Sequence, residues 1–228
     1  FKEGRFKDAE KISGEALADS LLRRKISCPG CPVACIHLAG LKSRFSPEHE
    51  RGRKEIYPEE ELVTYNYEPM YALGSNLCVN DPEGLIRLIQ RCENLGIDAM
   101  MTGTVLAWAT EAFESGLITS NDTLAVKLRW GDVESYLQAI DNIAEVKNSF
   151  YAKMAQGVIP VAEKYGGRDY AIALGKQGLA GYATGYGSVV GTLVGARHSH
   201  LSNSGYSIDQ KSFNPPPTPE EIADFLLE

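Results

Sequence analysis

The chain has 228 residues, a formal net charge of -7 and 43% hydrophobic residues. This length suits one large domain or two small ones, and the composition is that of an ordinary globular protein. The acidic balance argues against binding nucleic-acid phosphates by bulk electrostatics, and no apolar run approaches the roughly 20 residues of a membrane span. The first residues, FKEGRFKDAE, contain no hydrophobic signal core. Because the chain begins with Phe1 and not with Met, we expect a fragment of a longer protein.

Helical patterns dominate the first part of the chain. Ser13 can cap a first helix that extends through Leu22 and ends before the cysteines that follow. Asp81 followed by Pro82 predicts a second helix, because proline at the first helical position sacrifices no hydrogen bond.

Three further helical segments follow. Gly96 can end the second helix, Asp98 can cap the third, and Asp132 can cap a fourth. A last segment runs from about residue 150 to 165 with an interruption near Gly157. We find no strongly alternating strand pattern, so the predicted fold is all-α, an irregular multi-helix domain.

The composition changes at residue 166. Residues 166–205 contain ten glycines, too many for regular helices, so we expect a glycine-rich loop region there. The sequence thus predicts a helical domain over residues 1–165 and, over residues 166–228, a glycine-rich region leading into a second helical domain that the chain end truncates.

Three of the five cysteines lie within the segment SCPGCPVAC, in the spacing C-x2-C-x3-C. Cys28, Cys31 and Cys35 can point three thiolates at one centre, which suits a cubane iron-sulfur cluster with one distant fourth ligand. Zinc is the main alternative, with His37 or another cysteine completing a tetrahedral site. Chance or disulfide chemistry is the third.

The remaining cysteines carry less information. An odd cysteine number in a chain of this length favours a reduced, cytoplasmic compartment over a disulfide framework. Cys92 continues an apolar helix stripe, and we expect both Cys92 and Cys78 to be core positions.

Three other segments could carry chemistry. Glu68, in an aromatic and apolar setting, could give or take protons if buried, although composition alone favours an exposed loop glutamate. Asp98 could grip the polar edge of a ligand, but helix capping explains it fully. His198 and His200 could bind metal or transfer protons, but without context a surface loop is the better interpretation.

Six segments of the chain carry a resemblance to a known family. They are GRFKDAEKISGEAL, CPGCPVAC, YEPMYALGSNLCVND, CENLGIDAMMTGTVLAWATEAFESGLI, WGDVESYLQAIDNIA and VGARHSHLSNSGYSID. In this order they resemble the tungsten-containing aldehyde ferredoxin oxidoreductase family. The resemblance implies the first helical domain and the start of the second, without the N-terminal β-rich domain that covers one face of a tungsten bis-pterin cofactor.

The resemblance also implies a [4Fe-4S] cluster beside one pterin. It makes Cys28, Cys31 and Cys35 three of the cluster ligands, with the fourth cysteine of the family falling beyond residue 228.

The same resemblance assigns pterin-facing and active-site residues. Glu93, Asn94, Gly96 and Asp98 match a pterin-binding motif D-x-x-G-x-D, in which Glu93 replaces the first aspartate. Glu68 matches the active-site glutamate.

His200, which Leu201 follows, matches the active-site histidine, with His198 as the alternative. The Lys-Gly-Leu-Glu and Asp-Pro-Arg-Gly stretches common in the family are not intact in ALGKQGLAGYATGYG, so the substrate is left undefined.

The resemblance implies an oxidoreductase that converts aldehydes to carboxylic acids, or the reverse, at tungsten or molybdenum. Its electrons would pass through the cluster to ferredoxin or another electron-transfer subunit. We expect a cytoplasmic, anaerobic enzyme, of which this chain alone is inactive, and the oligomeric state is left open. The alternatives are the tungsten subunit of a benzoyl-CoA reductase-type ring reductase and a zinc-stabilised helical module without catalysis.

Overall fold

The computed structural model describes residues 6–42, 60–182 and 185–195, together with Gly205, Asp209, Thr218, Glu220 and Glu221. The chain divides into two compact units, residues 1–178 and 179–228. The functional division expected at residue 165 stays a prediction.

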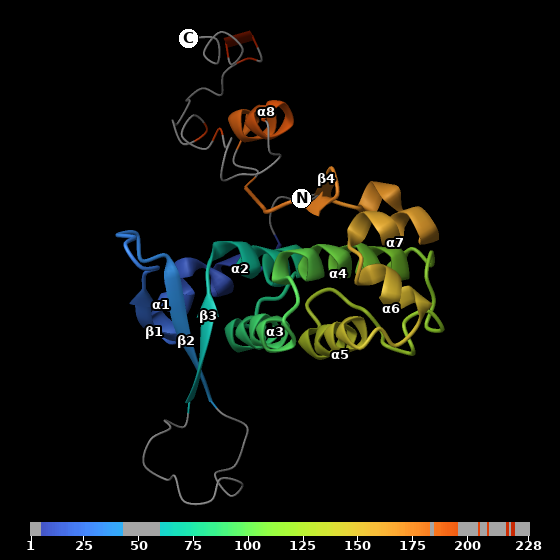
Figure 1. Cartoon of the computed structure of the whole chain (residues 1–228), viewed down its shortest axis with the longest axis horizontal. Helices are drawn as coiled ribbons and strands as arrows, with labels where there is room; N and C mark the ends of the chain where they lie inside the picture. The colour runs from blue at the N-terminus through green and yellow to red at the C-terminus, as the bar shows by residue number, and fades with distance from the viewer. Residues whose placement is uncertain are drawn as a thin grey trace, which may run out of the picture. The chain divides into compact units, whose positions relative to one another are not determined.

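Helices make up most of the first unit (Figure 1). They are α1 (Gly14–Ser20), α2 (Tyr67–Leu73), α3 (Pro82–Leu95), α4 (Ala99–Glu114), α5 (Val133–Ala144), α6 (Ser149–Met154) and α7 (Val158–Tyr165). The strands are β1 (Leu22–Ile26), β2 (Ile36–Lys42), β3 (Glu60–Tyr65), β4 (Ala173–Leu174) and β5 (Gln177–Gly178). In the second unit the structure describes one helix, α8 (Tyr186–Val194). The mainly helical fold is confirmed, and none of the described helices has the length and apolarity needed to cross a bilayer.

The predicted helix starts are confirmed by their caps. The side chains of Ser13, Asp81, Asp98 and Asp132 each accept a hydrogen bond from a backbone N–H two or three residues further on. Gly157, with φ of +105°, separates α6 from α7 as the interruption predicted. Local sequence therefore determines where these helices begin.

A three-stranded antiparallel sheet is the main feature that the sequence did not reveal. Its strand order is β1-β2-β3, and its first strand occupies residues that we expected to continue the first helix. Helix α1 ends at Ser20 instead, and Leu22 begins β1. The reason is non-local: the ladder from β1 to β2 outweighs the helix propensity of leucine, arginine and lysine.

The loop between β1 and β2 and the start of α2 lie at one end of this sheet (Figure 1). The ladder between β1 and β2 closes with the pair Ile26 and Ile36, so residues 27–35 form the tip of a hairpin. On the next strand, Tyr65 pairs with His37, and α2 begins two residues after Tyr65. The cysteine loop and the first turn of α2 therefore lie at the same end of the sheet.

Helix α4 organises the core. Trp108 is fully buried, and its indole Nε1 donates a hydrogen bond to the carbonyl oxygen of Gly167 over 3.0 Å. Helix α2 crosses α4 so closely that a Cβ on Gly103 would collide with the backbone carbonyl of Ala72. Glycine at position 103 thus permits the contact between the two helices.

Candidate functional site

The cysteine loop joins β1 to β2. A backbone hydrogen bond of 3.0 Å from the N–H of Cys31 to the carbonyl of Cys28 closes a tight turn, and Gly30 within it has φ of +77°. Ala34 also has a positive φ, +52°, just before Cys35. Non-glycine residues rarely adopt this conformation, so the loop bends sharply on both sides of Cys31.

The loop thiols are accessible and unbridged. Cys28 and Cys35 are exposed, Cys31 is half-buried, and none of them forms a disulfide. Within the described part of the chain, no three His, Cys, Asp or Glu side chains already converge as a metal site. The loop therefore places three soft donors within nine residues without fixing their geometry.

His37, on β2 immediately after the loop, holds a polar atom without a partner. Its Nδ1 is buried and, in the described structure, makes no hydrogen bond, while its ring stacks on Tyr65 with centroids 5.1 Å apart. A buried polar group without a partner is costly. The orphaned nitrogen and the three adjacent thiols fit a bound group at this end of the sheet, and three thiols suit either an iron-sulfur cluster or zinc.

The other two cysteines differ from the loop. Cys92 is fully buried, as expected, and burial raises the pKa of its thiol to about 12. Cys78, expected in the core, is only half-buried and has φ of +56°. A buried, protonated thiol such as Cys92 is a poor nucleophile and a poor metal ligand.

Glu68 lies in the first turn of α2 and is half-buried. A carboxylate there is favoured by the positive end of the helix dipole. On the same helix, burial raises the pKa of the Tyr71 hydroxyl well above its usual value. That hydroxyl lies 3.5 Å from Oδ1 of Asn76, whose Nδ2 donates to the carbonyl of Gly103 over 3.4 Å. This chain of polar groups ties the helix of Glu68 to α4.

The corner between α3 and α4 contains the predicted pterin-facing motif. Gly96 has φ of +66°, and its N–H donates to the carbonyl of Glu93, while the N–H of Ile97 donates to the carbonyl of Cys92. These two bonds form a Schellman motif, which ends α3. Asp98 then caps α4 by accepting at Oδ1 from the N–H of Met101 over 2.8 Å.

The residues of this motif differ in whether their side chains can still bind a ligand. Glu93 and Asn94 are exposed on the last turn of α3. The cap uses Oδ1 of Asp98, so Oδ2 can accept a further hydrogen bond. Gly96, with φ of +66°, allows the chain to turn between α3 and α4.

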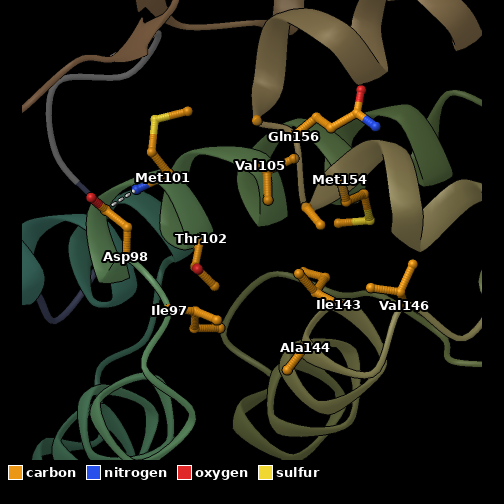
Figure 2. A pocket seen from close by; sticks show the side chains of 12 residues that line it. Ile97, Asp98, Met101, Thr102, Val105, Ile143, Ala144, Val146, Met154 and Gln156 are labelled. Atoms are coloured by element: carbon orange, nitrogen blue, oxygen red, sulfur yellow. Dashed lines mark hydrogen bonds between the residues drawn. The ribbon is translucent and has the colours of Figure 1, made fainter.

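A pocket of about 310 Å³ adjoins this corner (Figure 2). Its walls are mostly apolar and come from the start of α4, the end of α5 and the end of α6 with the residues that follow. The lining residues are Ile97, Asp98, Met101, Thr102, Val105, Ile143, Ala144, Val146, Met154, Ala155, Gln156 and Gly157. Asp98 contributes the one carboxylate to a largely apolar lining.

The structure thus assembles part of the predicted site. The cysteine loop and Glu68 share one end of the sheet, and the helices of Glu68 and Asp98 pack directly against each other. His198 and His200 lie outside the described residues.

Sequence reasoning missed two features of this region. The first is the pocket, because Met101 and Gln156 line it although they lie far apart in the sequence, and no local sequence pattern predicts this. The polar link from Tyr71 to Asn76 was also missed, although both residues lie in the segment YEPMYALGSN, which carries part of the resemblance.

Comparison with known proteins defines the class. The family model "Aldehyde ferredoxin oxidoreductase, domains 2 & 3" matches residues 1–226. The chain therefore belongs to the aldehyde ferredoxin oxidoreductase family.

Two relatives are tungsten-containing aldehyde ferredoxin oxidoreductases. The protein of Pyrococcus furiosus is 33% identical over 183 residues, and that of Thermococcus kodakarensis is 32% identical over 183 residues. Each match covers 80% of this chain but 28% of the relative, so the chain spans little more than a quarter of their length.

Two further proteins are similar to part of the chain, one in sequence and one in structure. An aliphatic sulfonate oxidoreductase, WOR-like subunit, of Pyrococcus furiosus is 31% identical over 135 residues, which is 59% of this chain and 20% of that protein. The solved active-site complex BamBC of benzoyl-coenzyme A reductase aligns with a TM-score of 0.56 at 21% identity, over 72% of this chain and 22% of that one. The structural match supports the fold.

Proposed function

We propose that the chain is part of a tungsten or molybdenum bis-pterin oxidoreductase that oxidises aldehydes to carboxylic acids. Its two electrons leave one at a time through a [4Fe-4S] cluster to ferredoxin or another electron-transfer subunit. The main observation in support is that the loop with its three accessible thiols and the helix that contains Glu68 lie at the same end of the sheet. Membership of a family with tungsten-containing relatives supports the proposal.

The chemistry is divided between cofactors and protein. Bound, the bis-pterin metal supplies the site of aldehyde oxidation and the cluster supplies a one-electron relay. An aldehyde and one water give a carboxylic acid, two protons and two electrons, so the protein must accept protons close to the substrate. Glu68 is the proposed acceptor because it is half-buried and lies three residues before Tyr71 on the same helix, where burial raises the pKa of the tyrosine hydroxyl. His200 is proposed as the second proton acceptor, on the basis of the family resemblance.

Other residues of the chain bind and orient. Cys28, Cys31 and Cys35 are the proposed ligands of the cluster, and the sharp turns on both sides of Cys31 allow one loop to supply all three. Oδ2 of Asp98 is the proposed acceptor for a donor edge of the pterin. The corner holds this carboxylate in place through the cap of α4.

Metal content tests the cluster. The natural protein, purified without oxygen, should contain iron and absorb in the broad iron-sulfur bands. Cys31→Ser should lose most of the iron, whereas Cys92→Ala, which removes a thiol buried in the core, should retain it. Zinc without iron would contradict the proposal and favour the helical module.

Turnover tests the substrate class and Glu68. We expect aldehydes to yield carboxylic acids, and Glu68→Gln to lower turnover by about 10²-fold or more at unchanged iron content. Product analysis with aldehydes and with aryl-CoA esters distinguishes the two enzyme types. Reduction of an aryl-CoA ring without aldehyde oxidation would refute the proposed reaction.

A further inference from the structure

The sequence segment that contains the cysteine loop has a net charge opposite in sign to that of the chain. Residues 20–42 contain four lysines and arginines and no aspartate or glutamate. The whole chain carries -7, so the remainder carries -11. The segment that contains the three cysteines is thus positively charged, although the chain as a whole is acidic.

Strand β1 carries three of these charges. Arg23, Arg24 and Lys25 are consecutive and exposed, and β1 is an outer strand of its sheet. Because neighbouring side chains on a strand point to opposite faces, the charges surround the strand. Cys28 follows Lys25 by three residues, so the basic strand leads directly into the loop.

Within the described residues, Arg23 alone of the three is engaged in an ion pair. Nε and Nη2 of Arg23 donate to the two carboxylate oxygens of Glu60 over 2.7 and 2.8 Å. In the part of the chain that the structure describes, neither Arg24 nor Lys25 forms an ion pair or a side-chain hydrogen bond. Among the residues that the structure describes, the positive charges of Arg24 and Lys25 are therefore not neutralised by an ion pair.

We propose that Arg24 and Lys25 form a docking surface for a small acidic electron-carrier protein of the ferredoxin class, which approaches the group held by the cysteine loop. The inference rests on the proposed function and adds the surface by which the partner is recognised. Charge complementarity is the argument: a basic spot steers an acidic partner and raises association rates by 10 to 10³-fold at low salt. No covalent step is involved, since one electron passes from cluster to carrier.

Two other roles for the same charges make different predictions. Charged side chains on an outer strand discourage pairing with other chains, and this role is indifferent to the electron acceptor. Positive charge can also offset the negative charge of a thiolate-bound cluster, and this role would change the cluster potential whichever acceptor is used.

The experiment uses the natural protein, purified without oxygen, with the double variant Arg24→Glu/Lys25→Glu. Electron transfer is measured to a purified acidic ferredoxin and to a small uncharged redox dye, each at low and high salt. We expect transfer to ferredoxin to fall by at least about 10-fold at low salt and the difference to shrink at high salt. Transfer to the dye and the midpoint potential of the cluster should stay unchanged.

Lys127→Glu/Arg129→Glu is the matched control. Both residues are exposed on the segment before α5, and the variant changes the net charge by the same amount. An equal loss in this control would show a bulk charge effect and overturn the proposal.

The remaining outcomes are also decisive. If the rate of electron transfer to ferredoxin is unchanged in the Arg24/Lys25 variant, the two charges serve only to discourage strand pairing at the sheet edge. If the rate with the dye falls equally, or the midpoint potential shifts, the two charges act on the cluster itself. In either case the docking surface fails while the proposed function stands. A natural protein without iron would refute the proposed function, and the docking surface with it.

Discussion

The cysteine loop and the α3–α4 corner are both short connections at the site, but they are held in different ways. In the corner, the Schellman bonds of Gly96 and Ile97 and the cap by Asp98 satisfy the backbone from within the chain. In the loop, residues 27–35 contain a single backbone hydrogen bond, between Cys31 and Cys28, and the thiols do not converge. The corner is thus held by several internal hydrogen bonds, whereas the loop is held by one.

The contrast extends to burial. Next to the corner, Cys92 is sealed in the core, while Cys28 and Cys35 face solvent. The thiol next to the corner is thus inaccessible, whereas two thiols of the loop are open to solvent. Stable, internally bonded segments resist local opening, and weakly bonded ones do not.

Alkylation of metal-free protein should give the largest difference. With iodoacetamide at mildly alkaline pH, Cys28 and Cys35 should react freely, and Cys92 at least 10³-fold more slowly. Cys92 reacts only when the core opens, which costs about 5 kcal/mol or more. Mass spectrometry of the labelled peptides measures each rate. Comparable rates for Cys92 and the loop would show that the corner is not the more stable region.

The raised pKa of Cys92 adds a pH dependence to the same comparison. The folded state keeps this thiol protonated to about pH 12, above the ordinary value of 9.0. Its contribution to stability is therefore fully present below pH 9 and is lost as the pH rises towards 12. Urea unfolding of the wild type and of Cys92→Ala across this window should show a steeper loss in the wild type.

Gly103→Ala should have the next largest effect. A methyl group there collides with the backbone of Ala72, which cannot move without separating α2 from α4. We expect a loss of about 3 kcal/mol in the free energy of unfolding, measured in urea. Gly14→Ala is the matched control, because its new methyl meets nothing within 4 Å and should change stability by less than about 1 kcal/mol.

Substitutions of Asp98 should have the smallest effect on stability. Asp98→Ala removes the cap of α4 and should cost about 1 kcal/mol, while Asp98→Asn keeps an acceptor oxygen and should cost only a few tenths. If the carboxylate also holds the pterin, Asp98→Asn should lower the retained pterin and tungsten although stability is nearly normal. Normal cofactor content in Asp98→Asn would limit Asp98 to capping.

Helix starts were predictable where a capping side chain marks them, whereas the end of α1 and the whole of α2 were not predicted. The caps at Ser13, Asp81, Asp98 and Asp132 and the stop at Gly96 are local patterns, and all five are confirmed. The sheet was not predictable in this way. The burial of β1 shows three exposed residues in succession instead of an alternation, and only pairing with β2 makes it a strand.

The candidate site was accessible to sequence reasoning only in part. The cysteine spacing and the motif ending at Asp98 identify residues, and the structure places the Cys28 to Cys35 loop next to the Glu68 helix. The unpartnered nitrogen of His37 and the pocket beside Asp98 depend on contacts between distant segments. Such contacts leave no periodic signal in the sequence.

The pairing of Ile26 with Ile36 closes the hairpin without any help from sulfur. If the loop holds the proposed cluster, the strand pairing alone brings Cys28 and Cys35 to the two ends of one hairpin tip, so the sheet does not depend on the metal for its topology. Metal-free protein should then keep the three-stranded sheet, and iron could be added after the chain has folded.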